Sequence, residues 1–145
     1  MNFIIYNSTG TILRTGSCPN SMLSIQAQNG ETVIEGVAND QTQYIADGEV
    51  TDYTTEQLAA KSSVPYGYKW NPATMSAIQT ATDSEITAYL ATQARAKRDQ
   101  LLTASDWTQT ADQSDAIKAK WQSYRQDLRD ITEQAGFPNT ITWPT

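Results

Sequence analysis

The sequence of 145 residues contains no histidine and a single cysteine, Cys18. Without histidine there is no Ser-His or Cys-His catalytic pair, no histidine-ligated metal site and no side chain that ordinarily titrates near neutral pH. A lone cysteine forms no disulfide within the chain and no thiolate metal cluster. These absences exclude the commonest hydrolase and metalloenzyme classes. We therefore expect a protein that is not an enzyme and that uses no cofactor and no metal.

Basic residues and long apolar runs are also scarce. Ten Lys and Arg stand against 16 Asp and Glu, which gives a formal net charge of −6. A protein of this charge is poorly attracted to the phosphates of nucleic acids or to anionic membranes. No segment approaches the roughly 20 apolar residues of a membrane-spanning helix. We expect a protein made in a cytoplasm whose partners are other proteins, with neither nucleic acid nor membrane among them.

Glycine and proline are unevenly distributed along the chain. Six of the seven glycines lie in residues 1–80, whereas residues 81–135 contain neither glycine nor proline. The first part combines short β-type runs, such as Phe3–Tyr6, with turn sequences, and Asp47-Gly48 is its strongest hairpin signal. The sequence predicts an α+β protein in which a small antiparallel β region with short helical turns, residues 1–80, precedes a helical part.

Two helices are predicted within residues 81–136. A capping box, Thr82-Asp83-Ser84-Glu85, begins the first helix. The second begins between Asp112 and Ser114, and Gly136 ends it. Its apolar side chains recur every three or four residues and form one stripe: Ile117, Trp121, Tyr124, Leu128, Ile131 and Ala135. About ten residues connect the two helices, which favours an antiparallel α-helical hairpin followed by an extended tail, residues 137–145.

Charged side chains of the second helix are interpreted as a solvated face with weak ion pairs rather than as acid–base catalysts. They comprise Asp112, Asp115, Asp127 and Asp130, interleaved with Lys118, Lys120, Arg125 and Arg129. The basic cluster Arg95-Ala96-Lys97-Arg98 either contacts an acidic partner or balances Asp99 and Asp106 near the end of the first helix. We favour the second interpretation.

Aromatic residues outside the core stripe are the candidates for binding a partner, because interfaces use aromatic anchors. Trp107 lies in the connection between the helices. The tail carries Phe137, Ile141 and Trp143 together with two prolines, so it either packs on its own helices or docks on a partner. We take these four residues, Trp107, Phe137, Ile141 and Trp143, as the candidate partner-binding residues.

Residues 90–145 carry a distinctive series of short motifs. These are Arg98-Asp99-Gln100-Leu101-Leu102, Ser105-Asp106-Trp107-Thr108-Gln109, Trp121–Ile131 with the sequence WQSYRQDLRDI, and Gly136-Phe137-Pro138. In this order and spacing they resemble the phage tail assembly chaperone family. The start of the chain, Gly10–Pro19, also resembles small phage tail proteins, with lower specificity.

The resemblance implies a non-enzymatic bacteriophage tail protein. It would assist the assembly of, or bind to, tail or tail-fibre polypeptides in the host cell cytoplasm. The alternative is a structural component retained in the virion tail, as an adaptor or fibre-associated subunit, with a homo-oligomer following from the symmetry of the tail. The motifs are open to two interpretations: a folding signature of the hairpin, in which Arg129 and Asp106 join the interhelical loop to the second helix, or a binding surface.

Overall fold

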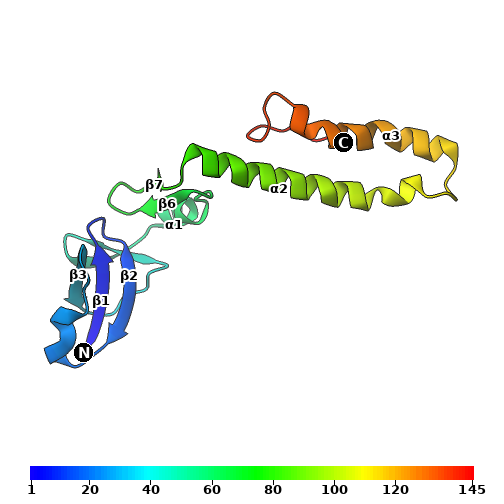
Figure 1. Ribbon diagram of the computed structural model, residues 1–145. Coiled ribbons are helices and arrows are strands. Elements are labelled where there is room, and N and C mark those ends of the chain that lie inside the picture. The colour runs from blue at the N-terminus through cyan, green and yellow to red at the C-terminus, as the bar shows by residue number, and fades with distance from the viewer. The chain divides into compact units, whose positions relative to one another are not determined.

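The computed structural model describes residues 1–145, which divide into two compact units, Met1–Thr80 and Ala81–Thr145. All strands belong to the first unit and both long helices to the second (Figure 1). The predicted α+β class, an antiparallel β region followed by a helical hairpin, is confirmed. None of the helices combines the length and the apolar character that crossing a membrane requires.

The first unit is built on a three-stranded antiparallel sheet in the order β2-β1-β3. Its strands are β1 (Asn2–Asn7), β2 (Ile12–Ser17) and β3 (Glu31–Glu35). Successive side chains of a strand point to opposite faces, so Ile4 and Ile5 lie on different sides of β1. Both are fully buried. The central strand is therefore covered on both faces, which explains why it is a continuous apolar run rather than an alternating one.

A hairpin covers one face of this sheet. It consists of β4 (Gln43–Ala46) and β5 (Glu49–Asp52). The turn residues Asp47 and Gly48 have φ values of 51° and 85°, the left-handed conformations that a two-residue hairpin turn needs, as their sequence predicts. Ile45 packs with Ile4 and Ile12 in the core, and its backbone N–H donates to the Gly10 carbonyl at 2.8 Å. Gly10 has no room for a Cβ beside the Ile45 carbonyl, so a glycine is required there.

The remaining elements of this unit were predicted less completely. Helix α1 (Thr55–Ser62) begins at a capping box formed by Thr54 and Gln57. Strand β6 (Tyr68–Asn71) has a partner that the sequence did not indicate, β7 (Ser76–Gln79), all of whose residues are exposed. The segment between β2 and β3 contains a 3-10 helix, η1 (Asn20–Ile25), in which no residue is buried.

A cross-strand ion pair fixes the segment after η1 to the sheet. Nη1 and Nη2 of Arg14 each donate to one oxygen of the Glu31 carboxylate at 2.7 Å, and Nη2 also donates to the Gln26 carbonyl at 2.7 Å. The backbone N–H of Gln28 donates to the same carboxylate at 2.8 Å. The Arg14 hydrogen bonds, followed by the one from Gln28, lower the pKa of Glu31 from its ordinary 4.5 to about 2.

This lowered pKa predicts how acid affects the first unit. The folded state holds the Glu31 proton less tightly than the unfolded state, so the ion pair stabilises the fold fully above pH 4.5 and loses its effect as the pH falls from 4.5 to about 2. We expect Glu31→Gln to flatten the pH dependence of the unfolding midpoint in that interval, with Glu35→Gln on the same strand as the control. Equal slopes for the two variants, measured by thermal unfolding, would contradict the assignment.

The second unit is an antiparallel helical hairpin, α2 (Asp83–Ala104) and α3 (Asp115–Arg129), joined through the 3-10 helix η2 (Asp106–Gln109) (Figure 1). The predicted capping box is present: the Thr82 side chain accepts from the Glu85 backbone N–H, and the Glu85 carboxylate accepts from the Thr82 backbone N–H at 2.8 Å. The hydrogen bonds that the Glu85 carboxylate accepts from the Thr82 backbone N–H and from the Thr82 hydroxyl lower the pKa of Glu85.

The predicted end of the second helix is wrong. Helix α3 ends at Arg129, and a 3-10 helix, η3 (Asp130–Glu133), follows it, so Gly136 lies outside any helix. Ile131 remains fully buried whereas Ala135 is exposed. The step of three residues from Leu128 to Ile131 suits an α-helix and a 3-10 helix equally, so the stripe does not reveal the change.

Candidate interaction surface

One buried arginine joins the two helices of the hairpin. Arg125, only 8% exposed, donates from Nη1 to the Leu102 carbonyl at 2.8 Å and to Ser105 Oγ at 2.6 Å. From Nη2 it donates to Asp106 Oδ1 at 2.8 Å. We call this group, Arg125 with the Leu102 carbonyl, Ser105 and Asp106, the hairpin joint.

The hairpin joint corrects two predictions. Arg125 does not belong to the solvated face, because it points from α3 to the end of α2. Arg125, not Arg129, binds Asp106; Arg129 is exposed and its nearest described partner is Gln126, at 3.5 Å. Of the other charged residues in the prediction, Asp112, Asp115, Lys120 and Asp127 are exposed as expected, whereas Lys118 and Asp130 are half-buried.

The joint follows from the chemistry of a helix end. The last carbonyls of an α-helix lack partners within the helix and carry a partial negative charge, so they bind cations and hydroxyl groups. Ser105 Oγ donates to the carbonyls of Leu101 and Leu102 at 3.0 and 2.9 Å. Thr108, fully buried, donates to the Ser105 carbonyl at 2.7 Å. Ser105 and Asp106 thus bind Arg125 of α3, and Thr108 binds the Ser105 carbonyl within the connection between the helices.

Trp107 lies in the middle of the motif Ser105-Asp106-Trp107-Thr108-Gln109 but takes no part in the hairpin joint. Its side chain is 52% exposed, the largest exposed aromatic group of the second unit. It lies edge-on to Trp121 with 5.9 Å between ring centroids, and Trp121 lies edge-on to Tyr124 at 5.4 Å. We call Trp107, Trp121 and Tyr124 the aromatic cluster. Edge-to-face packing of this kind orients the rings and limits their motion.

The exposure of two members of the aromatic cluster was not predicted from the sequence. Trp121 and Tyr124 were assigned to the core because of their helical spacing, but both are only half-buried. Spacing identifies the face that a helix turns toward its neighbour, but not how far the neighbour extends. Here the neighbour α2 ends at Ala104, and the short η2 with Trp107 follows. The signal that remained in the sequence was Trp107 itself, placed directly after the helix.

A hollow of about 370 Å³ adjoins the aromatic cluster. It is lined by Lys120, Trp121, Tyr124, Pro144 and Thr145, so the end of the chain forms one of its walls. A second hollow, of about 270 Å³, lies between Trp143 and the acidic side chains Asp127 and Asp130. The surface near the end of the tail therefore combines aromatic rings, a proline and charges of both signs.

The tail packs on its own helices. The Gln134 side chain donates to the Thr142 carbonyl at 2.9 Å and accepts from the Thr142 N–H at 2.8 Å. Arg95 lies over the Phe137 ring at 5.5 Å from its centroid, and Lys97 lies over Trp143 at 4.2 Å. Two members of the basic cluster thus contact tail rings, a role that the sequence did not indicate, while Arg98 pairs with Asp99 at 2.7 Å.

The four candidate partner-binding residues are therefore distributed over the surface rather than gathered in one patch. Trp107 contacts Trp121, whereas Phe137 and Trp143 contact the basic side chains of α2. Phe137, Ile141 and Trp143 are half-buried, and only Trp107 is exposed. Their binding of a partner stays a prediction.

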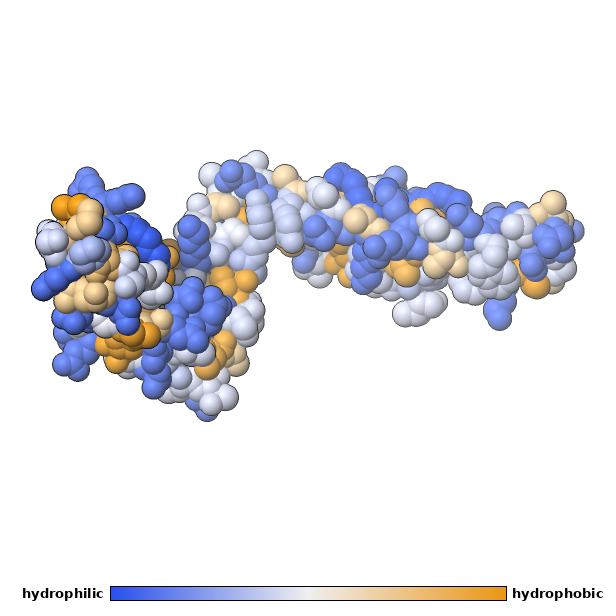
Figure 2. Space-filling model, turned by 90° about the horizontal axis from the view of Figure 1, so that it is seen from below, coloured by the Kyte–Doolittle hydropathy of each residue, from blue (hydrophilic) through white to orange (hydrophobic).

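The face of the helical unit seen in Figure 2 is largely hydrophilic. It shows small, separated orange areas among blue and white residues. No group of three or more Cys, Asp or Glu side chains is placed to hold a metal ion. Binding by this unit would therefore depend on a few aromatic side chains rather than on a broad hydrophobic surface.

Comparison with known proteins adds one result. Residues 91–145 match the family model described as phage tail assembly chaperone protein, which confirms the resemblance over this segment. The matched segment begins within α2 and includes the hairpin joint, the aromatic cluster and the tail. The searches of curated proteins and of solved structures found no significant match.

Proposed function

We propose that this protein assists the assembly of a bacteriophage tail by binding tail or tail-fibre polypeptides through the aromatic cluster. The family match supports a role in phage tail assembly, and the observation that carries the rest is the position of Trp107 within the matched segment. The protein acts by binding alone, without catalysis, in the cytoplasm of the host cell.

The motif Ser105-Asp106-Trp107-Thr108 explains why Trp107 is the anchor. Its three polar residues are used within the hairpin, so their chemistry is accounted for by folding. Trp107 is not, because 52% of it faces solvent. An exposed tryptophan held by a second ring is typical of an anchor that fills a pocket on a partner. The two interpretations of the motif thus combine: most of it folds the hairpin, and one residue binds.

The proposed partner is an apolar or aromatic segment of an unassembled tail polypeptide. Such segments are exposed before assembly and buried after it, so a protein that covers them for a time prevents wrong association. The rings of Trp107, Trp121 and Tyr124 offer apolar area, and Lys120 beside them offers one positive charge. The net charge of −6 disfavours nucleic acid as a competing partner.

Co-expression tests this function. The protein, or its Trp107→Ala variant, would be produced with the tail and fibre proteins of the same phage, and both the soluble fraction and the co-purified complex would be measured. We expect Trp107→Ala to weaken binding by about 30-fold, the effect of losing an interface anchor worth about 2 kcal/mol. Tyr66→Ala is the control, since Tyr66 is 51% exposed but lies in the first unit.

Two results would contradict the proposal. One is unchanged binding by a Trp107→Ala variant whose circular dichroism spectrum and unfolding midpoint match the parent. The other is a fixed copy number of the protein in purified virions, measured by mass spectrometry, because an assembly factor leaves before the particle is complete. That second result would favour the alternative, a structural subunit retained in the tail.

A further inference from the structure

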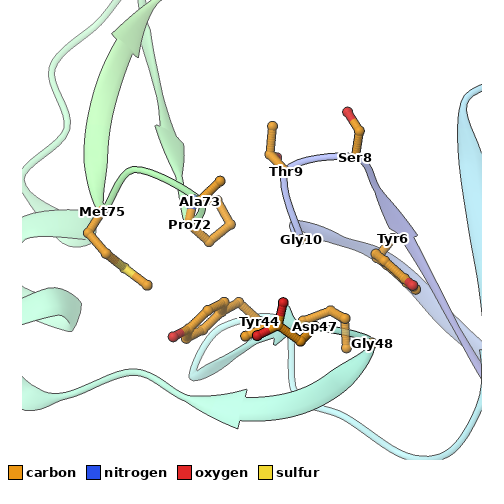
Figure 3. A pocket seen from close by; sticks show the side chains of 12 residues that line it. Tyr6, Ser8, Thr9, Gly10, Tyr44, Asp47, Gly48, Pro72, Ala73 and Met75 are labelled. Atoms are coloured by element: carbon orange, nitrogen blue, oxygen red, sulfur yellow. The ribbon is translucent and has the colours of Figure 1, made fainter.

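Three hairpin turns of the first unit meet around a pocket of about 430 Å³ (Figure 3). Ser8, Thr9 and Gly10 come from the turn between β1 and β2. Asp47 and Gly48 form the turn between β4 and β5, and residues 72–75 supply the turn between β6 and β7. All of these residues precede the segment matched by the family model, so the match assigns nothing to the pocket.

Two residues of the pocket have an unusual backbone conformation. Asp47 and Met75, with φ values of 51° and 50°, are the only residues other than glycine with positive φ, and both line the pocket. Asp tolerates this conformation because its short polar side chain bonds locally, but methionine has no such compensation. Residues held in unfavourable conformations cluster at ligand sites. Glycine or asparagine at position 75 would suit the turn better than methionine does.

The pocket is lined by groups that attract a cation. Figure 3 shows the rings of Tyr6 and Tyr44, the Met75 thioether and the Asp47 side chain around one space. Asp47 is the only lining residue with a formal charge, and no Lys or Arg is present. Residues 1–80 carry seven Asp and Glu against three Lys and Arg, a net charge of −4. Aromatic faces and sulfur pack against the carbon stem of a basic side chain, and the carboxylate pairs with its charge.

The Tyr44 ring that lines the pocket stacks on a second tyrosine, Tyr53, and this second ring already contacts a cation. Tyr44 stacks on Tyr53 with 4.7 Å between ring centroids, and Lys61 Nζ lies 4.8 Å from the centre of the Tyr53 ring. Lys61 Nζ also donates to the carbonyls of Asp40 and Gln41, at 2.7 and 2.9 Å. An internal lysine thus shows how an ammonium group, an aromatic ring and oxygen acceptors fit together in this unit. The stacking also fixes the position of the Tyr44 ring that lines the pocket.

We propose that the three-turn pocket binds a lysine or arginine side chain of a polypeptide partner, with the carbon stem between the tyrosine rings and Met75 and the charge against Asp47. This site is independent of the aromatic cluster, because the two belong to different units. Phosphate and carboxylate ligands are disfavoured, since the pocket offers them no positive charge.

The test is a titration of the full ¹⁵N-labelled chain followed by backbone amide shifts. The probes are Nα-acetyl-lysine amide and Nα-acetyl-arginine amide, whose side chains keep their positive charge. The neutral controls are N-acetyl-norleucine amide, which has a similar carbon stem, and methyl glucoside. We expect one of the basic probes to cause saturable shifts at Ser8–Gly10 and at Asp47-Gly48, with weaker binding at higher salt.

Two variants make the test specific. Asp47→Asn removes the charge and keeps a residue that accepts the left-handed conformation, so the turn is preserved. We expect it to weaken binding at least about threefold, the scale of an exposed ion pair. Glu49→Gln, two residues away and outside the pocket, removes the same charge and should leave binding unchanged.

Several outcomes would overturn the proposal. Equal binding of the norleucine probe would show that charge is not recognised, and saturable shifts with methyl glucoside alone would reassign the pocket to a neutral saccharide. No saturable shift with either basic probe, or an Asp47→Asn variant that binds as well as the parent, would remove the site. None of these results bears on Trp107 and tail assembly.

Discussion

Replacing Arg125 by methionine is expected to lower the free energy of unfolding of the second unit by about 2–4 kcal/mol, because the substitution removes hydrogen bonds from a charged donor and leaves the buried Ser105 oxygen without one. Ser105 is 2% exposed, so its Oγ loses a donor in a place that water reaches poorly, while the Leu102 carbonyl keeps its hydrogen bonds from the Ser105 hydroxyl and N–H. Asp106 is 63% exposed at its side chain and regains water, so it adds little. The buried Arg125 Nε has no partner, and its removal keeps the expected loss below that of a fully satisfied ion pair.

Two matched variants distinguish the hairpin joint from general charge effects. Arg129→Met makes the same chemical change four residues further along α3, where the side chain is exposed, and should alter stability by less than about 0.5 kcal/mol. Asp106→Asn keeps an oxygen acceptor and should cost less than about 1 kcal/mol. Thermal or urea unfolding measures all three. A larger loss for Arg129→Met than for Arg125→Met would restore the sequence-based interpretation and refute the joint.

Replacing Leu128 by alanine is expected to cost about 2–5 kcal/mol, since it removes buried methyl groups and leaves a cavity between the helices. Leu128 is fully buried, and Ile131, one helical turn later, is equally so. Leu128→Met conserves volume and should cost less than about 1.5 kcal/mol. Trp121→Ala should cost less than a buried aromatic ordinarily does, because Trp121 is half-buried.

The order in which Leu128→Ala, Leu128→Met and Trp121→Ala lower the free energy of unfolding is the informative result. If Leu128→Ala unfolds at the same urea concentration as the parent, the apolar stripe is not the core of the hairpin. If Trp121→Ala is the most damaging of the three, the aromatic cluster is part of the core, and its role in binding a partner has to be abandoned.

Sequence reasoning succeeded where a signal is local. Asp47-Gly48 forms its hairpin turn, and Thr82 with Glu85 forms its capping box, because each arrangement is determined by two or three neighbouring residues. Strand β7 was missed because its residues are exposed and its turn contains Met75, a residue that does not indicate a left-handed conformation. Asn71 Oδ1 accepts from the Ala73 N–H at 2.9 Å within this turn, but the propensity of methionine does not indicate a positive φ.

The candidate interaction surface shows the same difference between features that local sequence predicts and features that depend on distant residues. Trp107 was identified from its position between two helices, and it is exposed as that position suggests. Arg125 was misassigned because an arginine among alternating charges is ordinarily solvated. Its burial depends on the end of α2, which lies 20 residues earlier in the chain, at Ser105. Contacts over such a separation carry no periodic signal, so only the structure reveals them.

The contacts that shape the hairpin have a consequence for how such a gene can change. The joint, the rings around Trp107 and the hydrogen bonds between Gln134 and Thr142 all use residues after position 81, and the three-turn pocket uses only residues before it. A recombination event near codon 81 would therefore exchange the residues around the pocket without altering those that form the joint. The contacts described in each half leave the other half free to change by itself.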